Sequence, residues 1–131
     1  MALLSRDQIA EAKDVVFEDV EVPEWGGSVR VRGLTARQRG EYEQSLVKGT
    51  GRNRSIEMRG GRERLLVLCC VDETGMALFT ADDVRMLARK SAAAVERVYD
   101  VAARISGLTE AEAGADLEDF DTAQSGDSST D

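Results

Sequence analysis

The stretch VEVPEWGGSVRVRGLT, residues 20–35, decides the fold. Apolar and polar residues alternate on both sides of Gly26 and Gly27, and a helix start follows at Leu34-Thr35. A two-residue turn between antiparallel strands needs positive φ at its centre, and glycine adopts positive φ without a steric penalty. The pattern therefore predicts a β-hairpin whose loop is Gly26-Gly27.

The pairing that follows from this loop is that of a half-buried hairpin. It places Val22 opposite Val31 and Glu21 opposite Arg32. An apolar pair then lies on one face and an opposite-charge pair on the other. A slip of one residue would move Val29 and Val31 to the solvent face, so we expect this register.

Trp25 is the large aromatic residue of this hairpin, and two roles for it are open. Pro23 has no backbone N–H, so the first strand is expected at a sheet edge, with Trp25 on the same polar face as Arg30. Trp25 either covers the core edge or stacks on Arg30, or it is an exposed anchor for a partner. In a Trp25→Ala variant, weaker partner binding by a folded protein would indicate the anchor, and unfolding would assign Trp25 to the core.

Four to five helices are expected around the hairpin, which gives an α+β fold: a small β-hairpin or sheet packed with helices. Ser/Thr capping motifs open three of them, and the apolar run LLVLCCV favours a buried helix. The first helix has only Ile9 and Ala10 as apolar anchors. The expected helices cover roughly residues 6–12, 36–47, 65–71, 81–89 and 91–106.

Residues 48–61, KGTGRNRSIEMRGG, are predicted to form a basic loop with Lys48, Arg52, Arg54 and Arg59. Basic charge attracts phosphate, but no aromatic residues for base stacking are interleaved with it. The glycines that begin the loop lack the full pattern of a phosphate-binding loop. We expect a solvated loop without nucleic-acid binding. Pairing with the acidic tail or with an acidic partner is the alternative.

The net charge of the chain lies entirely in its C-terminal tail. Residues 108–131 hold eight of the 25 acidic residues and none of the 17 basic residues, so the rest of the chain is neutral. Segments rich in charge and poor in apolar residues do not bury enough surface to fold. We predict a folded domain over residues 1–108 and a disordered acidic tail over residues 109–131.

The chain has the features of a cytosolic protein. It contains no apolar run of the roughly 18 residues that a membrane-spanning helix needs, and MALLSRDQ does not resemble a signal peptide. Cys69 and Cys70 are the only cysteines, and the chain has no histidine. A zinc ligand set is therefore missing, and both residues are expected to be buried free thiols.

Catalysis is not expected. Without histidine the chain lacks the commonest general acid–base group. The carboxylate pair Asp82-Asp83 lies at an expected helix start, where negative charge stabilises the helix dipole. We therefore expect a binding or assembly factor that is not an enzyme and that uses no metal and no cofactor.

Three segments together resemble the tail assembly chaperones of long-tailed bacteriophages with non-contractile tails. They are VEVPEWGGSVRVRGLTARQR at residues 20–39, VLCCVDETGMALFTADDVRML at residues 67–87, and KSAAAVERVYDVAARISGL at residues 90–108. The resemblance covers roughly residues 1–108 and rests on the pattern and order of these segments.

The resemblance implies an α+β protein of the host cytoplasm that acts in tail morphogenesis and is absent from the mature virion. Such proteins bind the tape measure protein, keep it soluble and help to recruit tail tube subunits. They are often made in two forms, the longer one by a programmed ribosomal frameshift. This chain would be the shorter form, with the longer form as a partner, and a homo-oligomer is compatible with the sequence.

A long helical client requires exposed apolar or aromatic grooves and complementary charge. Two other classes stay open: a structural head–tail or minor tail component of the virion, and a nucleic-acid-related factor. The candidate partner-binding residues are Trp25 and Arg30 on the hairpin, Arg52, Arg54 and Arg59 in the basic loop, and Glu118, Asp119, Phe120 and Asp121 in the tail.

Overall fold

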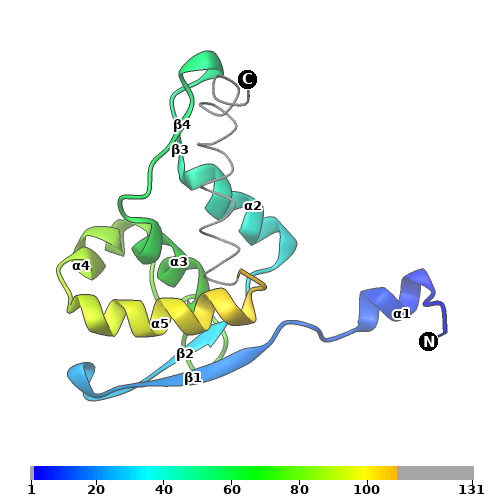
Figure 1. The fold of residues 1–131 in the computed structure, drawn as a ribbon. Coiled ribbons are helices and arrows are strands. Elements are labelled where there is room, and N and C mark those ends of the chain that lie inside the picture. Colours follow the sequence, from blue (N-terminus) through cyan, green and yellow to red (C-terminus); the bar gives the residue numbers. More distant parts are fainter. Residues whose placement is uncertain (1, 109–131) are drawn as a thin grey trace, which may run out of the picture.

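The structure is a computed structural model that describes residues 2–108. Within them a three-stranded antiparallel sheet and five α-helices form the predicted α+β fold (Figure 1). The helices are α1 (Arg6–Glu11), α2 (Ala36–Ser45), α3 (Gly61–Cys69), α4 (Val84–Ala88) and α5 (Ala92–Ile105). The strands are β1 (Phe17–Val22), β2 (Gly27–Arg32), β3 (Val47–Lys48), β4 (Ser55–Ile56) and β5 (Cys70–Val71). The predicted disordered tail lies outside the described residues.

The predicted β1–β2 hairpin forms, but its predicted register is wrong. Pro23–Trp25 form a 3-10 turn, and Gly26 ends it with φ 79°. The first strand therefore ends before Pro23, and the loop is not Gly26-Gly27 as predicted. Proline fixes its own φ and has no N–H for the strand ladder, which explains why the turn begins there. Val22 consequently pairs with Gly27 and not with Val31.

The faces of the hairpin nevertheless agree with the prediction. The register differs from the expected one by four residues, an even number, and an even shift keeps every side chain on its face. Val20, Val22 and Val31 are buried. β1 lies at the edge of the sheet order β1-β2-β5, as its proline predicted.

The core lies between the sheet and the helices. Figure 1 shows α5 across the β1–β2 hairpin, and α5 also packs against α3, which in turn contacts α2 and α4. α5 turns one apolar face to the core, with Val95, Val98 and Ala102 buried. The run LLVLCCV is a helix up to Cys69, and its last two residues form β5 beside β2.

The predicted Ser/Thr capping motifs are confirmed, whereas α3 begins at Gly61, four residues before its expected start. Capping boxes join Ser5 to Gln8 and Thr35 to Gln38, and the Thr80 motif opens the 3-10 turn Ala81–Asp83 before α4. The predicted anchors of the first helix are wrong, because α1 buries none of its residues and projects from the body (Figure 1). None of the helices within residues 2–108 is long and apolar enough to cross a membrane.

Residues 48–61 contain more structure than the predicted loop. β3 and β4 pair antiparallel, Val47 with Ile56 and Lys48 with Ser55, around a 3-10 turn at Gly51–Asn53. Gly49 permits the tight return, because its φ is 80° and a Cβ there would lie within 2.4 Å of the Asn53 carbonyl oxygen. The glycines of this segment therefore shape a short hairpin.

Both cysteines are buried free thiols, as predicted. Burial raises the pKa of Cys69 to about 11 and that of Cys70 to about 12. We expect neither thiol of the native protein to react appreciably with a disulfide reagent at about pH 8, since the thiolate is the reactive form. Both should react once urea unfolds the chain, and fast reaction in buffer alone would contradict this burial.

Candidate partner-binding surface

A groove runs along the face of the sheet that points away from α5. Two adjoining hollows of about 470 Å³ and 280 Å³ share Asp19, Arg30 and Glu73 in their walls. Phe17 lines the first hollow and Leu78 lines the second. We call this surface the sheet-face groove. Its two sides are the β1–β2 hairpin and the turn that follows β5.

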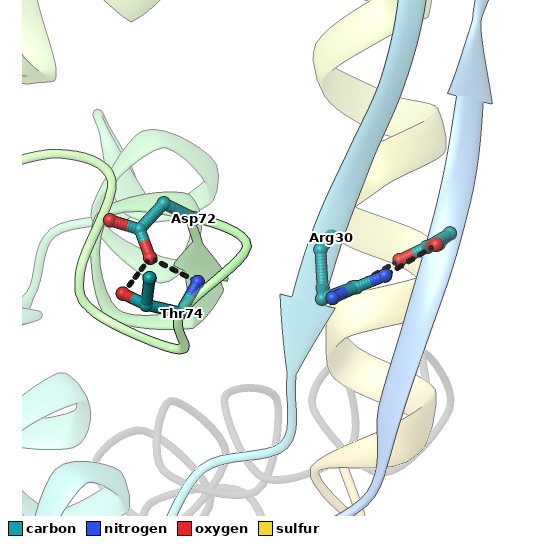
Figure 2. A network of polar contacts seen from close by, with 4 residues as sticks. Arg30, Asp72 and Thr74 are labelled. Atoms are coloured by element: carbon teal, nitrogen blue, oxygen red, sulfur yellow. Dashed lines mark hydrogen bonds and ion pairs between the residues drawn. The ribbon is translucent and has the colours of Figure 1, made fainter.

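The turn after β5 is held rigid by one carboxylate. Oδ1 of Asp72 accepts hydrogen bonds from Thr74 N at 2.8 Å and from Thr74 Oγ1 at 2.6 Å (Figure 2). It also accepts from Met76 N at 3.0 Å. The hydrogen bond from the Thr74 hydroxyl is the main cause that lowers the pKa of Asp72 below its ordinary value. Gly75 closes the turn at φ 88°. Asp72 therefore positions this side of the groove.

Arg30 forms part of the opposite side. Its Nε donates to Oδ1 of Asp19 at 2.7 Å, and a second guanidinium nitrogen donates to Oδ2 at 3.1 Å (Figure 2). The hydrogen bond from Arg30 lowers the pKa of Asp19, and the same contact raises the pKa of Arg30. Arg30 is thus paired with Asp19 across the hairpin. The predicted place of Trp25 on the polar face beside Arg30 is wrong, because Trp25 belongs to the 3-10 turn and not to a strand. It is half-buried and packs against the core, which is the covering role considered for it.

Large apolar side chains are exposed at this groove. Phe17 is 52% exposed, and Met76 and Leu78 are also exposed beyond the turn. The sequence contained a signal for Phe17 that was not used, because it alternates in step with Asp19 and Glu21 on the polar face. An exposed aromatic residue that adjoins other exposed apolar side chains is typical of a contact surface.

The N-terminal arm, residues 2–16, is a second apolar surface. Its exposed side chains belong to α1, to the residues before it and to the approach to β1. The arm was predicted to carry a small anchored helix, so its exposure was not foreseen. The exposed large apolar residues of the arm are Leu3, Leu4, Ile9 and Val16.

Two ion pairs fix the sheet to α5. Glu24 in the hairpin turn accepts from both terminal nitrogens of Arg97, at 2.7 Å and 2.9 Å, and Glu18 on β1 accepts from Arg104. The hydrogen bonds from Arg97 are the main cause that lowers the pKa of Glu24 from 4.5 to about 2. The hairpin turn is therefore held to the helix by a charged contact whose strength depends on pH.

We expect this contact to lose its stabilising effect in acid. A lowered pKa in the folded state means that ionised Glu24 stabilises the fold above about pH 4.5 and that the effect disappears as the pH falls toward 2. The melting temperature of Glu24→Gln should therefore decline less than that of the unsubstituted protein over this range. The exposed Glu21→Gln is the matched control, and equal acid sensitivity of the two variants would refute the expectation.

The structure separates the candidate residues that sequence reasoning proposed. Trp25 and Arg30 lie on the β1–β2 hairpin, whereas Arg52, Arg54 and Arg59 lie on or next to the β3–β4 hairpin, at the other end of the molecule (Figure 1). These two groups cannot form one compact site. Residues 118–121 lie outside the described part of the chain.

Comparison with known proteins assigns the family. A sequence profile described as phage tail assembly chaperone matches residues 5–119. The chain belongs to this family. The fold of this tail assembly chaperone also resembles the solved structure of the bacteriophage HK97 tail assembly chaperone, with a TM-score of 0.50 and 15% sequence identity over 79% of this chain and 92% of the other. No curated protein sequence matches the chain.

Proposed function

We propose that this tail assembly chaperone binds the tape measure protein, keeps it soluble in the host cytoplasm and helps to recruit tail tube subunits. It acts without catalysis and leaves before the virion is mature. The chain is the shorter product of its reading frame, and a longer frameshifted form is a further partner. The observation that carries the proposal is the sheet-face groove, which has exposed Phe17 and Leu78 on its sides and charged residues between them, in a member of this family.

The groove has the chemistry to hold a helical client. Amphipathic helices place apolar side chains at intervals of three to four residues into apolar grooves. Phe17 and Leu78 supply apolar contacts from opposite sides, and the polar side chains between them are held in place by the Arg30–Asp19 pair. Glu73 adds a carboxylate, which fits basic residues on the client. Among the sequence-based candidates, Trp25 and Arg30 lie on the β1–β2 hairpin, which forms one side of the groove.

Co-expression with the tape measure protein from the same genome tests the proposal. We expect the client to become soluble and to co-purify with this chain. Phe17→Ala should reduce the amount of client recovered, whereas Val16→Ala should not, because Val16 is equally exposed but does not line the groove. Both variants should retain the circular dichroism spectrum of the unsubstituted protein.

Three outcomes would count against the proposal. An insoluble client that never co-elutes, even with the longer form present, would remove the chaperone role. Detection of the chain in purified particles would favour a structural component of the virion. If Phe17→Ala and Val16→Ala reduce the recovered client equally, the chaperone function is retained but the groove is not the binding site.

A further inference from the structure

The β3–β4 hairpin gathers positive charge without matching acids. Within residues 2–108, ion pairs engage six of the 17 basic side chains, and none of the six lies on this hairpin. Glu57 is the single acidic residue between residues 44 and 62. We define the basic hairpin by its exposed basic side chains, Lys48, Arg52, Arg54 and Arg59.

The opposite charge lies in the same chain. Residues 109–131 carry the eight acids that give the protein its net charge of −8, and residues 116–121, DLEDFD, are the densest part. This segment also contains Leu117 and Phe120. On the basic hairpin, Met58 is an exposed apolar side chain beside Arg59. The two segments therefore carry opposite charge. Each also offers an apolar side chain, Phe120 on one and Met58 on the other, and thioether–aromatic contacts are favourable.

The tail is long enough to reach this surface. Leu108 is buried, and its backbone N–H donates to the Ala103 carbonyl, so the tail starts from a fixed point on the body. Residue 121 follows 13 residues later, and an extended chain spans at most about 3.3–3.6 Å per residue. The reach is therefore roughly 45 Å for residue 121 and roughly 28 Å for residue 116, and both exceed the radius of gyration of about 13 Å that a domain of 100 residues has.

We propose that residues 116–121 dock on the basic hairpin of the same chain, with their four carboxylates facing its basic side chains and Phe120 on Met58. Single exposed ion pairs contribute little, so several must act together. Docking within one chain profits from an effective concentration in the millimolar range. The tail then covers the basic hairpin and keeps other acidic surfaces away from it. This inference does not depend on the identity of the client.

A second exposed basic cluster makes the proposal specific and supplies a control. Arg85, Arg89 and Lys90 lie on or directly after α4. Like the basic hairpin, they take part in none of the ion pairs found within residues 2–108. Unlike the basic hairpin, this cluster directly follows two carboxylates, Asp82 and Asp83. It therefore attracts the tail less. Removing its three charges changes the net charge as much as removing three from the hairpin.

A nitroxide label on an Ala123→Cys variant of the full chain tests the docking. The label should react selectively, because both native thiols are buried. We expect loss of amide peak intensity at residues 48–59 at low ionic strength, and recovery of that intensity at about 1 M salt, where the Debye length falls to about 3 Å. The triple variant R52S/R54S/R59S should abolish the loss, and R85S/R89S/K90S should leave it unchanged.

A tail variant covers the case in which the hairpin variant disturbs the fold. Asp116→Asn, Glu118→Gln, Asp119→Asn and Asp121→Asn together change no residue of the body and should also restore the hairpin peaks. The proposal is overturned if the label leaves residues 48–59 unaffected at low salt, or if it affects both basic clusters equally. If the label has no effect on the hairpin peaks but an added DNA duplex shifts them, the surface binds nucleic acid instead.

Discussion

Leu66→Ala should lower the free energy of unfolding by roughly 2–5 kcal/mol, the range found when a buried leucine is truncated. Leu66 is fully buried on α3, the helix that contacts α5 on one side and α2 on another. Truncation of the Leu66 side chain leaves a cavity between these helices, which cannot all move inward to fill it. Because a domain of this size is stable by about 5–15 kcal/mol, the loss is a large part of the total.

Urea unfolding followed by circular dichroism measures this loss as a shift of the midpoint at unchanged slope. The matched control is Leu4→Ala in the N-terminal arm, which removes the same atoms from an exposed position. We expect the control to change stability by less than about 0.5 kcal/mol. Similar effects of the two substitutions would mean that α3 is not the centre of the core.

The faces of the hairpin could be predicted from the sequence, but its register could not. Alternation alone assigned Val22 and Val31 to the buried face, and any even shift of the register leaves this assignment unchanged. The loop was placed at Gly26-Gly27 because two glycines satisfy a primed turn. In the structure the turn begins at Pro23 instead. Proline has no N–H for the strand ladder, and this effect outweighs the preference of Gly27 for a turn position.

The sheet-face groove could not be predicted from the sequence because it depends on the position of β5. Nothing in LLVLCCV marks the point where the helix ends and a strand begins, since a short apolar run suits either state. The change occurs at Cys70, where pairing with Val31 of β2 replaces helical hydrogen bonds. That tertiary contact brings the Asp72 turn beside Arg30 (Figure 2). No pattern in the sequence indicates that Arg30 is the neighbour of this turn across the groove.

Gly33→Ala is the second substitution with a large expected effect. A Cβ at residue 33 would lie 2.6 Å from the carbonyl oxygen of Ile105 and 3.3 Å from its carbonyl carbon. Both obstructing atoms are backbone at the end of α5, so a side-chain rotation cannot relieve the contact. The next residue, Leu34, donates its N–H to Ser106 Oγ at 3.0 Å, so movement would also strain this link.

We therefore expect Gly33→Ala to destabilise the fold by about 1–3 kcal/mol, the usual effect of adding a methyl group to a closely packed site. Gly40→Ala is the matched control, because it makes the same chemical change within α2 with no atom inside 4 Å of the new Cβ. The control should stabilise the protein by up to about 1 kcal/mol, since alanine favours a helix over glycine. Opposite signs in urea unfolding would confirm that residue 33, directly after β2, lies too close to the end of α5 for any side chain, and two stabilising changes would disprove it.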